Sequence, residues 1–167
     1  MAAQAIILMG VSGSGKTTIG ELLGQALGWP FYDADDFHPP ANVERMRRGI
    51  ALTDEDREPW LAALSRLIGE ALTAEQSLVL ACSALKEAYR ERLKARGAMA
   101  ERVRFVYLRV PPEVAAARTK NRRGHFMPAA LVPSQFAALE EPAAATVIDA
   151  TQSPEEIVAA IRRALAL

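Results

Sequence analysis

The chain has 167 residues, of which 50% are hydrophobic and 24% are charged, and its formal net charge is zero. This length suits one domain with a full hydrophobic core, which folds without disulfides or a structural metal. The neutral charge argues against a broad nucleic-acid footprint, and one cysteine with two histidines cannot supply the ligands of a zinc finger.

The N-terminal segment, the length of the apolar runs and the single cysteine predict the cellular compartment of the protein. The N-terminal segment MAAQAIILMG has no basic flank and no long apolar run, so we expect no signal peptide. No stretch reaches the roughly 18 apolar residues of a membrane helix. Cys82 permits no internal disulfide and fits a reducing compartment. We therefore expect a soluble, cytoplasmic protein whose residues 1–167 form one domain.

Apolar runs and helical periods alternate along the chain. Short apolar runs predict buried strands, with a weaker one in second place, at 5–9, 30–33, 77–82, 103–110 and 146–150. Helical periodicity predicts helices at 16–28, 58–72, 84–95, 111–122 and 153–167. Gly28 can end the first of these helices, and Ser153 with Glu156 forms a capping box for the last. This alternation predicts an α/β fold, a parallel sheet with helices on both faces.

One segment breaks the alternation. Residues 121–133, NRRGHFMPAALVP, combine two arginines, a glycine and two prolines with weak periodicity. A polar excursion of this length in a compact domain is usually functional or mobile. We expect a mobile lid there.

Residues 10–17, GVSGSGKT, match the phosphate-binding pattern G-x-x-x-x-G-K-[ST] at every fixed position, between a strand and a helix. The glycines let successive backbone N–H groups point at a β-phosphate, and the helix N-terminus adds a partial positive charge. Lys16 would reach the β- and γ-phosphates, and the Thr17 hydroxyl would bind Mg²⁺. We expect ATP and Mg²⁺ to be held here by Gly10, Val11, Ser12, Gly13, Ser14, Gly15, Lys16, Thr17 and Thr18.

Loops of this kind serve GTPase switches, motor ATPases and small-molecule kinases. The guanine-reading N-K-x-D and the D-x-x-G of a switch are absent. A motor normally has an acid at the end of a hydrophobic strand, whereas the run 77–82 ends in Cys82 and is followed by Ser83. Asp33 or Asp35 therefore remains as the second metal ligand. A small kinase suits both the length and the lid, because such enzymes must exclude water.

Longer stretches resemble the bacterial-type gluconokinases, in the group of the shikimate kinases and nucleoside monophosphate kinases. The matching stretches are MGVSGSGKTT, FYDADDFHPPANVERMRRGIALTDEDREPWL, ACSALKEAYRERL and RRGHFMPAALVPSQFAALEEP. The patterns GHFM…L..SQ..ALE and L.D.DR.PWL are far more specific than the phosphate loop. CSALK replaces the glycine-rich turn of shikimate kinases, and the glycine-proline-arginine stretch of nucleoside monophosphate kinases is also absent, which favours gluconate as the acceptor.

The resemblance implies a P-loop NTPase fold with five parallel strands in the order 2-3-1-4-5. It implies the reaction of ATP with D-gluconate to give 6-phosphogluconate and ADP, as part of gluconate utilisation, and a homodimer is common in the family. Two alternatives stay open at this point: a kinase of another small hydroxy acid such as shikimate, and a nucleotide-binding regulatory module without turnover.

The stretch FYDADDFHPP, residues 31–40, places acids just past the second strand, where a doubly wound sheet binds its ligands. In an extended segment the i, i+2 spacing would direct Asp33 and Asp35 the same way. We expect Asp33 to face the Mg²⁺ shell and Asp35 to accept hydrogen bonds from gluconate hydroxyls, and either could be the catalytic base. Asp36 could cap a turn, and His38 is assigned equally to a structural or a substrate-binding role.

Cations elsewhere would bind the carboxylate of a sugar acid. With Ser83 as a helix N-cap, Lys86 falls in the first turn and Arg90 follows on the same face. Both are therefore candidates to bind the carboxylate or the phosphate. The alternative is that they belong to a solvated basic face of the helix. Arg57 corresponds to an acceptor-binding arginine of the shikimate kinases. Thr53 and Asp56 fit a capping box, with Pro59 restarting the helix, and Trp60 is expected in the core or the pocket wall.

Arginines beside the lid complete the expected site. Arg122 and Arg123, next to Gly124, could stabilise the charge that phosphoryl transfer spreads over oxygen atoms, with Arg123 as the catalytic candidate and Arg122 beside the nucleotide. Arg118 resembles the residue that packs over adenine in this group, a role that suits a planar guanidinium. His125 is assigned equally to substrate binding and to ordering of the lid.

Overall fold

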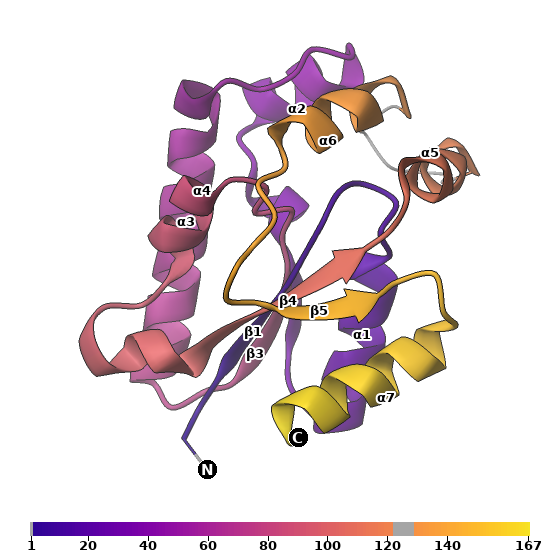
Figure 1. Ribbon diagram of the computed structural model, residues 1–167. Helices are drawn as coiled ribbons and strands as arrows, with labels where there is room; N and C mark the ends of the chain where they lie inside the picture. Colours follow the sequence, from indigo (N-terminus) through magenta and orange to yellow (C-terminus); the bar gives the residue numbers. More distant parts are fainter. Residues whose placement is uncertain (1, 122–128) are drawn as a thin grey trace.

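The computed structural model describes residues 2–121 and 129–167. Its centre is one sheet of five parallel strands in the order β2-β3-β1-β4-β5 (Figure 1). The strands are β1 (Ala5–Met9), β2 (Phe31–Asp33), β3 (Leu78–Ala81), β4 (Val103–Arg109) and β5 (Thr146–Asp149). The expected α/β class, P-loop NTPase strand order and parallel pairing are confirmed.

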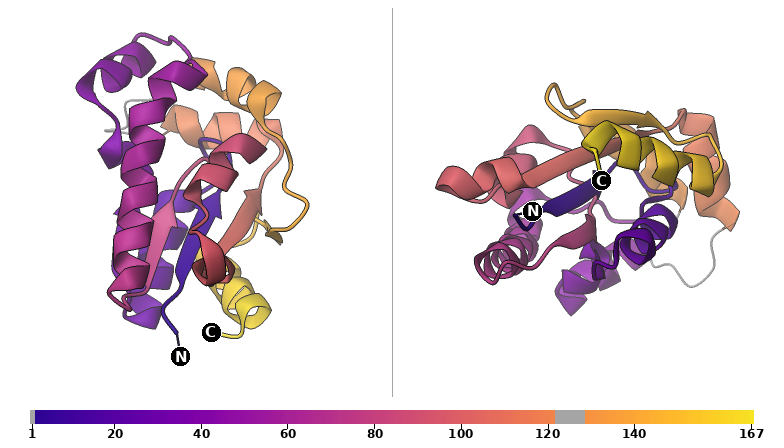
Figure 2. Two further views of the ribbon diagram at one scale, coloured as in Figure 1. Left: turned by 90° about the vertical axis from the view of Figure 1, so that its left-hand side faces the viewer. Right: turned by 90° about the horizontal axis from the view of Figure 1, so that it is seen from below.

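Helices cover both faces of this sheet (Figures 1 and 2). On one face α1 (Lys16–Leu27) lies beside α7 (Pro154–Leu165), and on the other α3 (Asp54–Thr73) lies beside α4 (Glu87–Leu93). The central strand β1 supplies both cores: Ile7 packs on the α3 side, whereas Ile6 packs on the α1 side. Burial from both faces explains why this strand is a continuous apolar run instead of an alternating one.

Three short helices gather at the end of the sheet where the strands terminate (Figure 1). They are α2 (Pro40–Arg47), α5 (Pro112–Asn121) and α6 (Val132–Ala138). Short 3-10 turns accompany them: η1 (Ala34–Phe37), η2 (Gly97–Arg102) and η3 (Ala129–Leu131). Because ligands of parallel sheets bind beyond the carboxyl ends of the strands, these helices surround the expected site.

Local signals placed most helix ends correctly. Gly28 ends α1 in the left-handed conformation, with φ 69°. Ser153 accepts a hydrogen bond from the Glu156 N–H at the start of α7, and Thr53 forms the expected capping box with Asp56 at the start of α3.

Two local predictions were wrong, and one helix was not predicted. The helix α3 does not restart at Pro59 but runs through it, since the carbonyl of Glu55 that loses its partner belongs to an exposed residue and can be solvated. The helix α4 begins at Glu87 with Lys86 as its N-cap, not near Ser83. The prolines Pro39 and Pro40 open the unpredicted helix α2, where a proline at the first position loses no helical hydrogen bond.

The segment expected to be a lid, 121–133, falls only partly within the described chain. Asn121 ends α5, and the segment's last residues form η3 and the start of α6. In the part of the chain that the structure describes, no helix is both long and apolar enough to cross a membrane.

Candidate active site

The loop between β1 and α1 bends in a way that only glycine accommodates at two positions. Gly13 has φ 85°, and a Cβ atom there would collide with the carbonyl of Ala115 in α5. Gly15, the N-cap of α1, has φ 96°. With these bends the loop forms a cradle of backbone N–H groups at the positive end of α1, which is the arrangement that binds phosphate.

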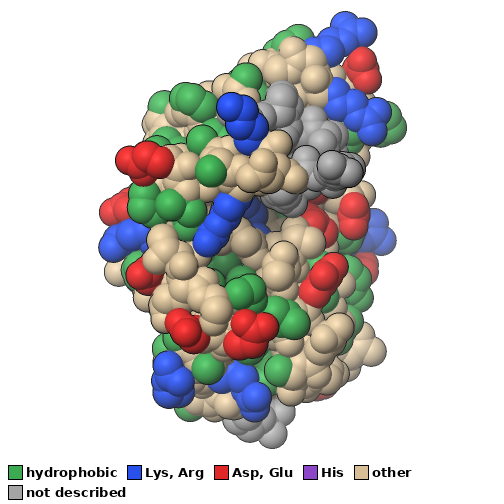
Figure 3. All heavy atoms as spheres, turned by 90° about the vertical axis from the view of Figure 1, so that its right-hand side faces the viewer, with side chains coloured by type: hydrophobic (Ala, Val, Ile, Leu, Met, Phe, Trp, Pro, Cys, Tyr) green, Lys and Arg blue, Asp and Glu red, His purple; other side chains and the backbone are tan. Residues whose placement is uncertain are grey.

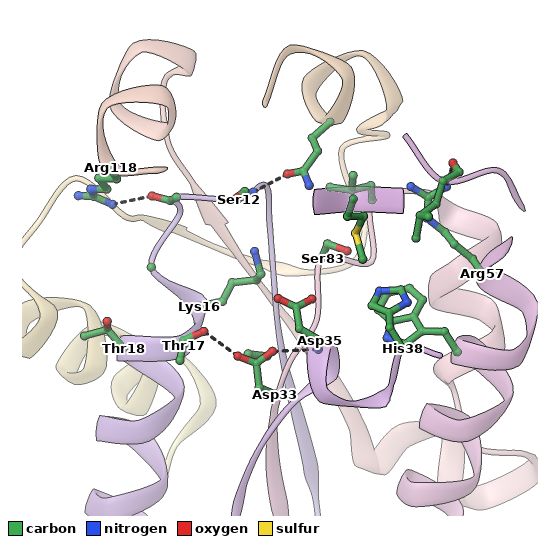
Figure 4. Close-up of a pocket in the computed structure, with 18 of the residues that line it drawn as sticks. Ser12, Lys16, Thr17, Thr18, Asp33, Asp35, His38, Arg57, Ser83 and Arg118 are labelled. Atoms are coloured by element: carbon green, nitrogen blue, oxygen red, sulfur yellow. Dashed lines mark hydrogen bonds between the residues drawn. The ribbon is translucent and has the colours of Figure 1, made fainter. Parts of the chain in front are cut away.

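Lys16 lies across this loop. Its ammonium group donates hydrogen bonds to the carbonyls of Gly10 and Val11, both at 2.9 Å. These two carbonyls hold the cation beside the loop, and Figure 4 shows the Lys16 side chain in the cavity. The positive charge therefore lies beside the place where the phosphates of a nucleotide would bind.

Thr17 and Asp33 connect the phosphate loop to strand β2. The Thr17 hydroxyl donates to Asp33 Oδ2 at 2.9 Å, and Asp33 Oδ1 accepts from the backbone N–H of Asp35 at 3.0 Å (Figure 4). Asp35 does not follow in an extended segment, as the i, i+2 argument assumed. It lies in η1, and the turn itself brings its carboxylate to the pocket.

A cavity of about 400 Å³ joins these groups to residues from distant parts of the chain. Its lining includes eleven residues predicted from the sequence: Ser12, Gly13, Gly15, Lys16, Thr17, Thr18, Asp33, Asp35, His38, Arg57 and Arg118. Five further predicted site residues that the structure describes are not in its lining: Lys86, Arg90 and three buried residues of the loop, Gly10, Val11 and Ser14. Asp36, for which only a turn-capping role was suggested, faces a neighbouring hollow. Figure 3 shows basic and acidic side chains interspersed on the face that it presents, without one broad basic patch.

Arg57 reaches the cavity from α3, and hydrogen bonds on the side of its guanidinium away from the phosphate loop hold it in place. Its Nη1 donates to the carbonyl of Leu52 at 2.7 Å and to the Tyr89 hydroxyl at 3.2 Å. Its guanidinium also lies 5.4 Å from the centre of the Tyr89 ring. The Tyr89 hydroxyl in turn donates to Asp54, and this hydrogen bond is the main cause of the lowered pKa of Asp54.

Lys86 lies outside this cavity. Its ammonium group bonds to Asp54 at 3.1 Å, and it lines a smaller adjoining cavity of about 230 Å³ that also reaches Arg57. The hydrogen bond to Asp54 raises the pKa of Lys86. Lys86 therefore belongs to the support around Arg57 in this structure.

The structure turns Arg90 away from the expected substrate contact. Its side chain is 4% exposed, and its guanidinium donates to the carbonyls of Ala84 at 2.7 Å and Glu140 at 2.8 Å. Because α4 starts at Glu87, Arg90 is the fourth residue of this helix, and its side chain reaches back to the backbone that leads into the helix. We therefore correct the sequence-based assignment: Arg90 ties two loops together.

His38 and Trp60 form the wall opposite the phosphate loop. Their rings stack with centroids 4.4 Å apart and planes 9° from parallel. Trp60 is both buried in the core and part of the cavity lining. Burial lowers the pKa of His38 to about 4, and nearby Arg57 acts in the same direction while Asp35 opposes it.

Two residues beside the phosphate loop come from the helices α5 and α6. Arg118 of α5 lines the cavity, and its Nη1 lies 3.4 Å from the carbonyl of Gly13. Gln135 of α6, which was not predicted, accepts a hydrogen bond from the backbone N–H of Ser12 at 2.6 Å and also lines the cavity. The only signal for Gln135 was its place in the pattern SQ..ALE, which identified a family but no contact.

The remaining lid predictions cannot be compared with coordinates. Arg122, Arg123 and His125 lie outside the described residues, as does Gly124. Within residues 2–121 and 129–167, no group of three or more His, Cys, Asp or Glu side chains could hold a metal ion. The Thr17 hydroxyl and the Asp33 carboxylate are hard oxygen donors, which suit Mg²⁺ when phosphates and water supply the other ligands.

Comparison with known proteins adds independent findings. The shikimate kinase family model matches residues 12–166. Among curated relatives, the gluconokinase of Gluconobacter oxydans (strain 621H) is 48% identical over 137 residues, which cover 82% of this chain and 75% of that protein.

Solved structures are similar over nearly the whole chain. The gluconokinase from Sinorhizobium meliloti 1021 superposes with a TM-score of 0.83 at 42% identity, covering 98% of this chain and 91% of that one. An unliganded sugar kinase from Janibacter sp. HTCC2649 superposes with a TM-score of 0.89 at 42% identity, covering 98% and 95%.

Proposed function

The chain belongs to the gluconokinases of the shikimate kinase family, and on that basis we propose that it transfers the γ-phosphoryl group of ATP to D-gluconate. The products are 6-phospho-D-gluconate and ADP. One observation carries the proposal: a single cavity has the phosphate loop on one wall and the Asp35 carboxylate with the Arg57 guanidinium on the other. A kinase of a sugar acid needs an acid beside the reacting hydroxyl and a cation that binds the carboxylate of the substrate, and Asp35 and Arg57 can supply them.

The donor side of the cavity binds ATP. In this proposal the backbone N–H groups of the loop hold the β-phosphate, and Lys16 exchanges its hydrogen bonds to Gly10 and Val11 for the β- and γ-phosphates. Arg118, at the side of the loop, stacks its planar guanidinium on the adenine.

The pair of Thr17 and Asp33 would hold Mg²⁺, directly through the hydroxyl and through coordinated water at the carboxylate. Their hydrogen bond of 2.9 Å places two oxygen atoms side by side, and a bound cation would take the place of this hydrogen bond. When bound, the ion neutralises charge that develops on the phosphate oxygens during transfer.

The acceptor side orients gluconate. Arg57 pairs with the carboxylate, an interaction for which a guanidinium is suited by its paired N–H groups. Asp35 accepts a hydrogen bond from the terminal primary hydroxyl and takes its proton as the new O–P bond forms and the bond to the β-phosphate oxygen breaks. The proton then leaves Asp35 to solvent, and ADP and 6-phospho-D-gluconate depart.

The lid arginines have a proposed role that rests on sequence alone. Arg123 would stabilise the equatorial oxygens of the transferring phosphoryl group, with Arg122 beside the nucleotide and His125 near the acceptor. We also propose that the reaction takes place in the cytoplasm, where ATP is made available to kinases of small metabolites.

A coupled assay of ADP release tests the function. With ATP and Mg²⁺, D-gluconate should give turnover well above the rate without acceptor, and ³¹P NMR should identify a primary phosphate ester as the product. Shikimate serves as the alternative acceptor and should give no more ADP than the control. A rate with gluconate equal to the control would contradict the proposal.

A further inference from the structure

The ring of His38 is held in one plane on the acceptor wall. It stacks on Trp60 at 4.4 Å between centroids, and the Trp60 indole N–H donates to the carbonyl of Ala34 at 2.7 Å. Trp60 is 2% exposed, so the stacking partner is itself fixed in the core. His38 can therefore rotate little, and each of its ring nitrogens faces a constant environment.

One of these nitrogens faces the side-chain amide of Asn42. Asn42 Nδ2 lies 3.2 Å from His38 Nδ1 and 2.7 Å from the backbone carbonyl oxygen of Asp56. A carbonyl oxygen can only accept a hydrogen bond, so the amide atom facing it must be the nitrogen. The two hydrogens of that nitrogen are then donated to the Asp56 carbonyl and to His38 Nδ1. An amide nitrogen cannot itself accept a hydrogen bond.

This contact decides the tautomer of the histidine. Because the Asn42 amide donates to Nδ1, Nδ1 must be the unprotonated nitrogen, and the neutral ring carries its proton on Nε2. Asn42 is 4% exposed, so water has little access to compete for this contact. The ring stays neutral at physiological pH, since burial and the charge of Arg57 outweigh Asp35 and lower its pKa to about 4.

The ring also borders the cavity. His38 is one of the cavity-lining residues, and in Figure 4 its ring lies beside Asp35 on the acceptor side. Among residues 2–121 and 129–167, only Asn42 forms a hydrogen bond to the imidazole. An N–H group held at a fixed angle in a partly buried cavity is a neutral donor for an oxygen of the bound molecule.

We propose that His38 donates its Nε2–H to a hydroxyl oxygen of gluconate, and that Asn42 is the positioning residue that fixes this tautomer. The inference rests on the proposed function for the identity of the acceptor, but the tautomer does not. With it, the acceptor wall offers three different groups: a charged donor in Arg57, an acceptor in Asp35 and a neutral donor in His38. His38 is therefore a specificity-determining residue. Its rigid N–H group favours a substrate that has a hydroxyl oxygen at one position and in one configuration.

The tautomer can be measured on the free protein. The chain has only two histidines, so ¹⁵N-histidine labelling gives few signals, and the variant His38→Gln assigns those of His38. We expect a long-range ¹H–¹⁵N spectrum at pH 7 to show a protonated Nε2 and an unprotonated Nδ1. In Asn42→Ala the spectrum should move toward a mixture of tautomers. A protonated Nδ1 in the wild-type protein would overturn the proposal without touching the proposed function.

Kinetics test the contact to the acceptor. His38→Phe keeps a ring to stack on Trp60 but removes the donor, and His38→Gln keeps an N–H donor on a side chain of similar reach. Loss of a partly buried donor should raise the KM for gluconate roughly 5- to 150-fold in His38→Phe, with the KM for ATP unchanged. The rise should be smaller in His38→Gln.

The acceptor panel separates the possible failures. His38→Phe should also lose discrimination, so that the ratio of kcat/KM for D-gluconate to that for an aldonate epimer such as D-galactonate falls toward one. A wild-type KM and ratio in His38→Phe would overturn the inference while gluconate kinase activity stood. Absence of gluconate turnover in the wild-type protein would overturn the proposed function instead, and the NMR result would still decide the tautomer.

Discussion

The two walls of the cavity are built in different ways. The donor wall consists mainly of consecutive residues, 10–18, whose backbone bends at Gly13 and Gly15 to form a phosphate cradle. The acceptor wall brings together Asp35 of η1, His38 at the end of that turn and Arg57 of α3, and each acts through its side chain.

The walls also differ in how they are held. The donor cradle follows from local backbone geometry and the end of α1, so few other residues are needed to set it. Two of the three acceptor side chains are held by a partner outside the wall: Asn42 for His38 and Tyr89 for Arg57. A site made of backbone is therefore set by a short motif, whereas a site made of side chains depends on residues that never touch the substrate.

Removing the central donor cation should have the largest effect. Lys16→Ala should lower kcat/KM by about 10³-fold or more, because the variant loses the positive charge beside the β- and γ-phosphates. Steady-state kinetics with saturating gluconate measure the loss. Lys94→Ala, which removes an ion pair with Glu91 on α4, should leave the rate unchanged. Substantial activity in Lys16→Ala would mean that the donor wall depends less on this residue than its geometry indicates.

Removing the acceptor's acid should have the next largest effect and leave the donor wall intact. Asp35→Asn should lower kcat about 10²- to 10⁴-fold, as expected for loss of a general base. The Kd for ATP, from calorimetry, should stay within about twofold, since the loop is unchanged. Asp36→Asn is the matched control, because the neighbouring carboxylate faces a different hollow. Equal losses in both variants would make the effect one of turn structure.

Gln135 of α6 supports the donor wall from outside the loop, so its loss tests how far that wall depends on other residues. Gln135→Ala leaves the backbone N–H of Ser12, a residue that is 5% exposed, without its acceptor from α6. An unsatisfied donor costs about 1–3 kcal/mol, so we expect the KM for ATP to rise at least about fivefold. Gln25→Ala, at an exposed position of α1, is the control. An unchanged KM for ATP would show that the donor wall needs no support from α6.

Tyr89→Phe should weaken only the acceptor wall. The ring that lies against Arg57 is kept, but the hydroxyl that accepts from Arg57 and donates to Asp54 is lost. One hydrogen bond contributes about 0.5–1.5 kcal/mol, so the KM for gluconate should rise about 2- to 13-fold with the KM for ATP constant. Tyr107→Phe removes a hydroxyl that bonds to Glu141 and should change neither constant. A rise in the KM for ATP would break the separation of the walls.

The smallest effect concerns stability and pH. The unfolded chain binds a proton to His38 near its ordinary pKa of 6.5, whereas the folded protein does so only near 4. The unfolded state therefore holds more protons in this window, and this contribution to stability declines as pH falls from about 6.5 to about 4. Urea unfolding of the wild type and His38→Phe at several pH values should show a smaller decline in the variant. Parallel curves would contradict the low pKa.

Much of the fold could be predicted because its signals are local. The buried run of β1, the glycine at the end of α1 and the Ser153 cap each depend on a few neighbouring residues. The helix α2 was missed because the residues 40–47 have little apolar periodicity, and only Asn42 and Met46 are buried there. Its position is set by packing at the end of the sheet.

The acceptor site shows the same division. Arg57 and Lys86 were both proposed as substrate cations, yet only Arg57 lines the main cavity, while Lys86 pairs with Asp54. Both residues are cations, so their charge alone does not separate them in the sequence. What separates them is where α4 begins, one residue after Lys86, and that depends on the path of the chain leaving β3.

The donor side could be predicted from the sequence alone, since a cradle of backbone N–H groups needs only glycines at fixed spacing between a strand and a helix. The parallel sheet could be predicted as well, from continuous apolar strands that both faces bury. Only the tertiary structure decided that Asn42 orients His38, that Tyr89 holds Arg57 and that Gln135 reaches Ser12. These contacts join residues brought together by folding, and a side-chain hydrogen bond depends on distance and angle that no local pattern records.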